Sequence, residues 1–178
     1  VYEMPSITPR ICGICPVSHH LAGAKAGDKV MGVEPPHTAN LLRELMHMGQ
    51  IIQSHSMHFF ELAGPDLILG FDEDPAIRNV VGLIGADPDL TVRAVQLRAF
   101  GQDIIYQLGG RRIHPNFAIP GGVNRALTAE KRDHILSGLD KAIETTQIGI
   151  QLIKNWADAN ITEIERFAFP FEMKTISA

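Results

Sequence analysis

The sequence predicts a mainly α-helical fold, a bundle of long helices joined by short β and loop segments. Three stretches repeat apolar residues at alternating spacings of three and four, which is the period of a helix that buries one side. Proline and glycine pairs flank these stretches, as they do at helix ends. Long helices with seams of this period pack against one another as a bundle.

The first stretch predicts a helix of about 28 residues. It is expected to open near Pro35-Pro36, because proline is tolerated in a first turn, and to end at Gly64-Pro65. His55 lies on its apolar side and is interpreted as a buried core histidine rather than a ligand. The apolar side consists of Leu41, Leu45, Met48, Ile52, His55, Phe59 and Leu62.

The other two stretches predict helices that follow recognisable caps. Asp87-Pro88 supplies an N-cap and a first helical residue for the second helix, which Gly109-Gly110 is expected to close. Thr128 is expected to cap the third helix. The second stripe is Leu90, Ala94, Leu97, Gly101, Ile104 and Leu108, and the third is Leu136, Leu139, Ile143, Thr146, Ile150, Ile153 and Ala157.

Two loop-rich stretches, residues 63–76 and 109–124, separate the helices, and the second holds a short strand candidate at residues 117–119. Neither has the composition of a flexible linker, so residues 1–178 are expected to form a single domain. The chain begins at Val1 without a signal-peptide pattern, and its first motif follows almost at once. We therefore expect it to be an incomplete fragment of a longer protein.

The composition excludes several classes of protein. A formal net charge of −4 argues against a basic nucleic-acid-binding surface. No apolar run approaches the roughly 20 residues that a membrane span requires. The chain has only 2 cysteines, three positions apart, so it lacks the disulfide framework of small secreted domains.

These cysteines form the motif most informative about chemistry, Arg10-Ile11-Cys12-Gly13-Ile14-Cys15-Pro16. Glycine and proline favour a tight turn that can direct both sulfurs at one point. A pair of soft thiolates suits zinc, nickel, copper(I) or iron–sulfur chemistry. Arg10 is expected to favour the thiolate forms by its positive charge.

Spacing alone leaves several interpretations of the motif open. A thioredoxin-like dithiol would need a preceding strand, although Pro5 and Pro9 disfavour one there. A zinc half-site would add His19 or His20 and a further ligand. An iron–sulfur cluster needs about four thiolates. The two thiols could also simply lie in a turn.

The pattern Arg-x-Cys-Gly-x-Cys-x-x-x-His resembles the N-terminal metal-binding signature of [NiFe] hydrogenase large subunits. Arg10, Cys12, Gly13, Cys15 and His19 fill its five fixed positions. The resemblance extends along nearly the whole chain and is strongest to the soluble, cytoplasmic, NAD-reducing (bidirectional) type. The stretches that carry it further are residues 58–60, 65–70, 97–101, 109–115 and 120–122.

The resemblance implies roles for five residues. In this family four cysteinates hold nickel, and two of them bridge to an iron that carries carbon monoxide and cyanide. Cys12 would be a terminal nickel ligand and Cys15 a bridging one. His19 would donate to the bridging sulfur, and Arg10 would place positive charge near the thiolates or the diatomic ligands. His114 would lie near the small subunit, where it would hydrogen-bond a sulfur of the nearest iron–sulfur cluster.

The reaction implied by the resemblance is reversible heterolytic cleavage of H2, with a terminal thiolate as proton acceptor. Electrons would leave through iron–sulfur clusters in a partner small subunit, from which they would continue to a flavin-containing, NAD-reducing module. The family's second Cys-x-x-Cys pair is absent from the 178 residues, so the chain alone is expected to be inactive. The alternatives are a non-catalytic homologue of the respiratory complex I type, which lacks the metal cysteines, and a zinc-stabilised helical interaction module.

Overall fold

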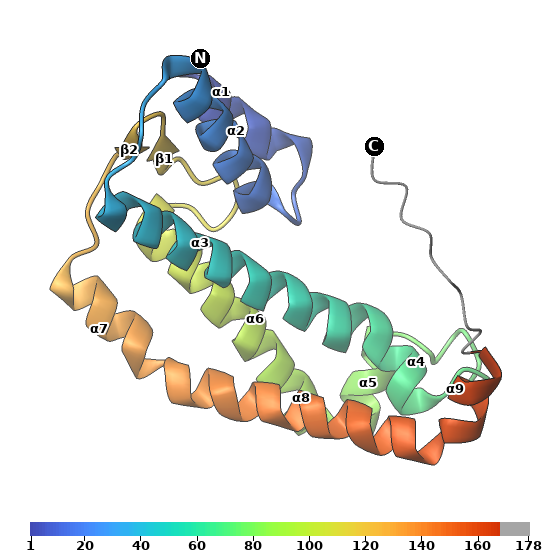
Figure 1. Ribbon diagram of the computed structural model, residues 1–178. Coiled ribbons are helices and arrows are strands. Elements are labelled where there is room, and N and C mark those ends of the chain that lie inside the picture. Colours follow the sequence, from blue (N-terminus) through green and yellow to red (C-terminus); the bar gives the residue numbers. More distant parts are fainter. Residues whose placement is uncertain (168–178) are drawn as a thin grey trace.

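The computed structural model, which describes residues 1–167, confirms a mainly helical fold with one small hairpin. Figure 1 shows α3 and α6 side by side at the centre, with α1, α2 and the hairpin at one end and α7 and α8 along one flank. The elements are α1 (Met4–Ile7), η1 (Thr8–Ile11), α2 (Pro16–Met31), α3 (His37–Ser56), η2 (Met57–Ala63), α4 (Gly64–Leu69), α5 (Val80–Ala86), α6 (Pro88–Gly109), β1 (Ala118–Ile119), β2 (Gly122–Val123), α7 (Ala129–Ser137), α8 (Leu139–Ala159) and α9 (Ile161–Phe167).

The α6 helix agrees with its prediction at both ends and along its buried side. The Asp87 carboxylate accepts the Leu90 N–H at 2.9 Å, which satisfies one of the free donors of the first turn. Gly110 closes the helix with a φ of 71°, a left-handed conformation that glycine adopts without strain. All six residues of its predicted apolar stripe are buried.

A close approach of two backbones joins α6 to α3. A Cβ atom built on Gly101 would lie 2.5 Å from the Gln53 nitrogen and 2.6 Å from the Gly49 carbonyl oxygen. A Cβ atom on Gly49 would likewise lie 3.0 Å from the Gly101 carbonyl oxygen, so the glycines allow the two helices to pack closely at this point.

The buried side predicted for the helix that contains α3 is only partly correct, because Leu45, Ile52 and Phe59 pack half-buried against the core whereas the other four predicted residues are exposed. Leu41 and Leu62 are 51% and 61% exposed, and His55 is exposed, with its Nδ1 donating to the Ile51 carbonyl at 3.0 Å. The buried side carries mainly small and polar residues instead, namely Ala39, Arg43, Met46, Gly49, Gln50, Gln53 and Ser56. These residues have partners in distant parts of the chain, which an apolar pattern cannot reveal.

The predicted end of this helix is wrong. The chain passes from α3 into a π-helical segment, η2, and Pro65 then occupies the first turn of α4 rather than stopping the helix.

In the third predicted helix, the buried positions lie about one residue before those of the predicted apolar stripe. Thr128 caps α7 as predicted, accepting the Lys131 N–H at 3.3 Å. The buried positions of α7 and α8 are Ile135, Ala142, Thr145 and Gly149, whereas Leu136, Leu139, Ile143 and Ile150 are each at least 40% exposed. The helix breaks at Gly138, where a Cβ atom would lie 2.8 Å from the Phe100 ring. Glycine at these positions permits close approach, Gly138 to Phe100 of α6 and Gly149 to Phe59 and Phe60 of η2.

The strand candidate is confirmed as β1, which pairs antiparallel with β2. A buried ion pair anchors this hairpin: Arg43 Nη1 lies 2.7 Å from the Asp28 carboxylate, and the two residues are 3% and 6% exposed. Arg43 also donates to the carbonyls of Ile119 and Gly122, and Asp28 accepts the Gly121 N–H. The pair therefore ties the hairpin to α2 and α3.

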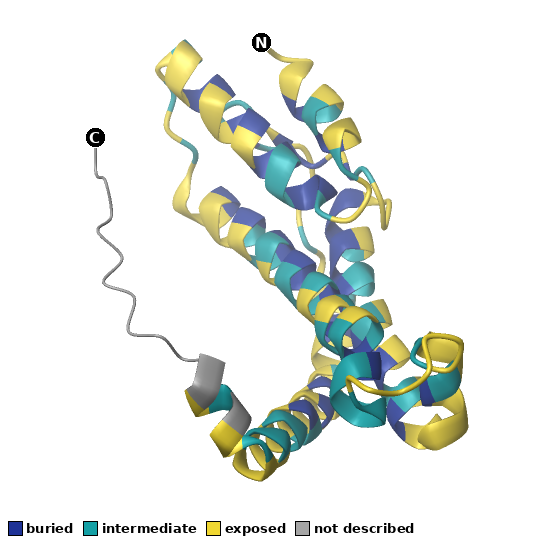
Figure 2. Ribbon diagram, turned by 90° about the vertical axis from the view of Figure 1, so that its right-hand side faces the viewer, coloured by how far each residue is buried: buried dark blue, intermediate teal, exposed yellow. Residues whose placement is uncertain are grey.

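Burial follows the helices closely, since each divides into a buried and an exposed face (Figure 2). The described helices include none long and apolar enough to cross a membrane.

Candidate metal centre

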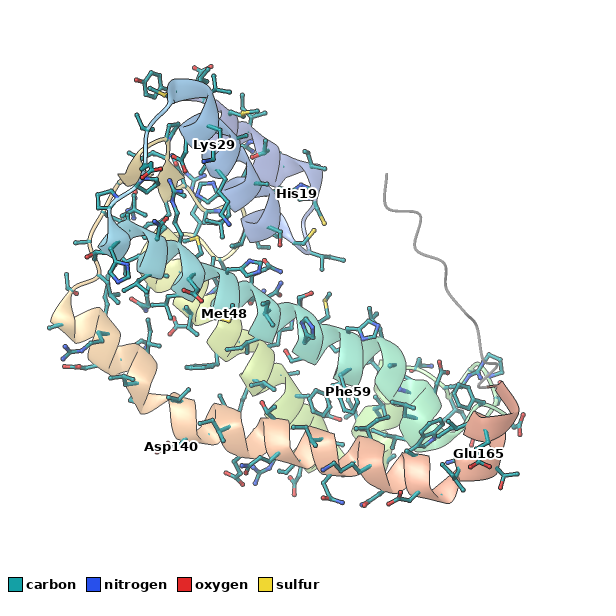
Figure 3. All side chains as sticks on the ribbon, in the orientation of Figure 1. His19, Lys29, Met48, Phe59, Asp140 and Glu165 are labelled. Carbon is teal, nitrogen blue, oxygen red and sulfur yellow. The ribbon has the colours of Figure 1, made fainter. Side chains whose placement is uncertain are left out.

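The cysteine motif forms the turn between η1 and α2. Cys12 is extended, and Cys15 is the N-cap of α2, followed by Pro16 at the first helical position. His19 therefore lies one helical turn beyond Cys15, at the end of α2 opposite Lys29 (Figure 3). The two sulfurs and a ring nitrogen of His19 all lie within 4.8 Å of one another, and both cysteines are free thiols.

Hydrogen bonds make the two thiols unequal. The Cys15 thiol and N–H both donate to Cys12 Sγ, the latter at 3.3 Å, and with the Ile14 N–H they lower the pKa of Cys12. The same hydrogen bond to Cys12, burial and the charge on Cys12 raise the pKa of Cys15. Arg10 was expected to favour the thiolates, but it is exposed, forms no ion pair with any described residue and is not a cause of either shift.

The donor set fits part of a soft-metal site. A thiolate binds such a metal at about 2.3 Å, so sulfurs up to roughly 4.6 Å apart can share one ion. The sulfurs of Cys12 and Cys15 lie within 4.8 Å of each other, close to this limit, and among the described residues no third thiolate or carboxylate joins them. The segment before the motif is helical in α1 and η1, so the strand that a thioredoxin-like dithiol needs is absent there.

His20 is not a ligand of this site but a buried connector. Its Nε2 accepts the N–H groups of Phe117 and Ala118 at 3.1 and 2.8 Å, and its Nδ1 donates to the Pro5 carbonyl at 2.6 Å. Since backbone N–H groups only donate, the ring must be neutral with its proton on Nδ1. Burial lowers the pKa of His20, which agrees with this assignment. A zinc site could therefore add only His19, and not His20, to the two cysteine ligands.

His114 holds the segment that precedes the cysteines. Its Nδ1 donates to the Pro9 carbonyl at 3.0 Å, and its φ is 53°, an unusual value for a residue with a side chain. A neutral ring with Nδ1 protonated presents Nε2 as an acceptor only. For His114 Nε2 to donate to a cluster sulfur, the ring would have to carry a proton on both nitrogens. Otherwise the hydrogen bond from Nδ1 to the Pro9 carbonyl would have to break.

Two residues that the sequence analysis missed also hold this turn. Gln50 and Gln53 of α3 both donate to the carbonyl of Ile14, at 3.0 and 2.7 Å. Their only sequence signal is a pair of glutamines one turn apart beside an apolar stripe, and that signal does not identify a partner 36 or 39 residues away.

Comparison with known proteins gives consistent matches. Residues 2–73 match the family described as nickel-dependent hydrogenase. One subunit of the F420-non-reducing hydrogenase vhu of Methanocaldococcus jannaschii is 50% identical over 163 residues, which covers 92% of this chain and 39% of that protein. The beta subunit of the NAD-reducing hydrogenase HoxS of Cupriavidus necator is 40% identical over 179 residues, or 94% of this chain and 37% of that protein.

Solved structures give the same result for the fold. A crystal structure of NAD+-reducing [NiFe]-hydrogenase in the H2-reduced state superposes with a TM-score of 0.88 and 44% identity, over 90% of this chain and 36% of that one. The Ni-Fe-Se hydrogenase of D. vulgaris Hildenborough shares the fold, with a TM-score of 0.78 at 24% identity, over 90% of this chain and 35% of that one. The chain thus spans well under half the length of each of these relatives.

Proposed function

Since this chain is homologous in sequence and fold to large subunits of nickel-dependent hydrogenases, we propose that it carries two of the four cysteine ligands of a Ni–Fe centre for reversible H2 cleavage. The observation that carries the proposal is the cluster of Cys12, Cys15 and His19 within 4.8 Å, inside the matched residues 2–73. When bound, the centre supplies the redox-active metals at which H2 is split heterolytically.

The residues of this chain then have distinct roles. Cys12 and Cys15 would hold the Ni–Fe centre, Cys12 as a ligand of nickel and Cys15 as a ligand shared with iron, since soft thiolates suit both metals. His19 places a ring nitrogen within 4.8 Å of both sulfurs, and we propose that it orients the bound pair from there. Arg10, exposed beside the turn, contributes positive charge toward the diatomic ligands of the iron. A cysteine thiolate of the centre would provide the acceptor for the proton released from H2.

We further propose that electrons leave through iron–sulfur clusters of a partner small subunit, with His114 on the side of the nearest cluster. A flavin-containing module would pass them to NAD in the cytoplasm, which the NAD-reducing relatives support. The vhu relative, which is 50% identical, is named an F420-non-reducing hydrogenase, and its name does not mention NAD. An electron acceptor other than NAD is therefore the competing outcome.

Residues 1–178 are proposed to be one domain of a longer polypeptide that supplies the second cysteine pair. The coverage of 37 to 39% of the two sequence relatives leaves ample length for that pair. The chain alone would hold half of the metal ligands.

Two other classes of protein remain as rivals. A homologue of the complex I type would lack the metal cysteines, whereas both are present and lie together here. A zinc-stabilised helical module would use the same cysteines with His19.

Metal analysis of the purified full-length protein separates these possibilities. The proposal predicts nickel and iron in equal amounts in the full-length protein separated from its small subunit, and H2-dependent reduction of an artificial acceptor by the complex of the two. Zinc alone, or no metal with intact folding, would contradict it.

A further inference from the structure

The carbonyl of Ile14 lies between the two cysteines and is held by two side chains. Gln50 Nε2 and Gln53 Nε2 donate to it at 3.0 and 2.7 Å. The two glutamines are only 2% and 5% exposed. A carbonyl oxygen has two lone pairs, so these two donors saturate it.

Little else in the described chain fixes the middle of the turn. The Ile14 side chain is 53% exposed, and a side-chain carbon on Gly13 would meet nothing within 4 Å. Apolar packing therefore does not hold these residues in place. The hydrogen bonds to the Ile14 carbonyl connect the turn to α3.

The glutamines are themselves rigidly placed. They lie about one turn apart on the buried side of α3, and the Gly101 backbone of α6 approaches the Gln53 nitrogen too closely for a side chain at position 101. Each amide must present its nitrogen to Ile14, because the reverse orientation would bring two oxygens together. The α3–α6 unit thus serves as a fixed reference for the cysteine turn.

The amide group of Gln50 destabilises the fold through its oxygen atom. Its Oε1 is buried and accepts no hydrogen bond from the described residues. A buried acceptor without a partner destabilises a fold, so an apolar side chain would serve packing alone better. Donation to Ile14 explains why a glutamine is present.

We propose that Gln50 and Gln53 are positioning residues that set the location of the Cys15 sulfur through the Ile14 carbonyl. The inference rests on the proposed function, in which Cys15 bridges the two metals. Neither glutamine touches a metal or H2. Their effect is to restrict the turn to the geometry in which both sulfurs bind one centre.

The test uses the full-length protein with Gln50→Met, Gln53→Met and the double variant, since methionine matches the length of glutamine without a donor. Ser56→Ala is the matched control, because Ser56 is equally buried on α3 but bonds only to the Gln53 carbonyl of its own helix. The readouts are the unfolding midpoint, nickel and iron content, and the infrared bands of the carbon monoxide and cyanide ligands. A fourth readout is the alkylation rate of Cys15 in metal-free protein.

In the double variant we expect loss of most of the nickel, shifted infrared bands and alkylation of Cys15 about tenfold faster, as the loss of roughly 1.4 kcal/mol of restraint would give. Ser56→Ala should change none of these. Wild-type bands, nickel content and alkylation in a folded double variant would overturn the inference.

If the double variant does not fold, the same measurements on the two single variants test the inference, with smaller expected effects. A wild-type protein without nickel contradicts the proposed function, whereas the alkylation rates still test the positioning role.

Discussion

At the scale of single residues, His20 is a buried polar side chain whose two ring nitrogens both have hydrogen-bond partners. His20 joins α1 to the segment that enters the hairpin, by way of one donated and two accepted hydrogen bonds. Because the ring is completely buried, no water can replace these contacts.

Replacing His20 with phenylalanine should therefore destabilise the protein by about 2 to 4 kcal/mol, since two N–H groups and one carbonyl lose their partner. The measurement is the free energy of unfolding by urea. The control is His58→Phe, because His58 is exposed in η2 and should stay within about 0.5 kcal/mol of the wild type. Equal losses in the two variants would show that the contacts of His20 contribute nothing.

The Asp28–Arg43 pair leads to a prediction about pH. Burial disfavours the charged carboxylate, but hydrogen bonds from Arg43 and Gly121 and the Arg43 charge outweigh it and lower the pKa of Asp28 below its ordinary 3.8. A carboxyl group with a lowered pKa stabilises the fold above its ordinary pKa, and this stability is lost as the pH falls through the lowered value.

Asp28→Asn should accordingly cost about 3 to 5 kcal/mol at neutral pH, because Arg43 keeps a buried charge without its counterion. Its unfolding midpoint should also fall less steeply than that of the wild type below pH 3.8. Parallel pH profiles for the two proteins would contradict this account. His20 adds a loss of stability that begins at higher pH, below its ordinary value of 6.5, in both proteins.

At the scale of elements, the packing of α3 on α6 depends on the absence of side chains. Gly101→Ala would place a methyl group 2.5 Å from a backbone nitrogen, which cannot move without displacing α3. We expect a loss of about 3 kcal/mol or more, which exceeds the usual cost of overpacking because backbone must shift.

The control for this variant is Gly85→Ala in α5, where the added carbon meets nothing within 4 Å. Alanine favours the helix there, so stability should rise by up to about 1 kcal/mol. Thermal unfolding of both variants is the measurement. A Gly101→Ala protein as stable as Gly85→Ala would mean that the two helices are not in close contact.

The elements differ in how far the sequence could predict them. The α6 helix buries apolar residues at the helical period, so its pattern, caps and buried side all agree with the structure. In α3 and α8 the buried sides hold Gly49, Gln53, Thr145 and Gly149, which an apolar stripe omits. Packing by small and hydrogen-bonded residues depends on partners distant in the chain, and local periodicity carries no information about those partners.

The same distinction holds for the site. The metal cluster lies within eight consecutive positions, so spacing alone could predict that Cys12, Cys15 and His19 converge. The Gln50, Gln53 and His114 contacts join it from 36 to 105 residues away, and no local pattern marks them.

At the scale of the whole molecule, the proposed function gives this chain one side of a metal site. The described residues bring two thiolates and one imidazole together and no further ligand. We expect that residues 1–178 expressed alone take up less than one equivalent of nickel at micromolar concentration and show no H2 oxidation, because a closed ligand set requires about four thiolates. Equilibrium dialysis with nickel is the measurement. Tight, stoichiometric nickel binding lost on Cys12→Ser would contradict the assignment of half a site.

The most direct test of the central claim is nickel K-edge X-ray absorption on the full-length protein and its Cys12→Ser, Cys15→Ser and Ser56→Ala variants. The account predicts a sulfur-rich nickel environment with a neighbouring iron in the wild type and in Ser56→Ala, and loss of nickel or of sulfur ligands in both cysteine variants. Nickel bound only through nitrogen and oxygen, or an unchanged spectrum in the cysteine variants, would contradict it.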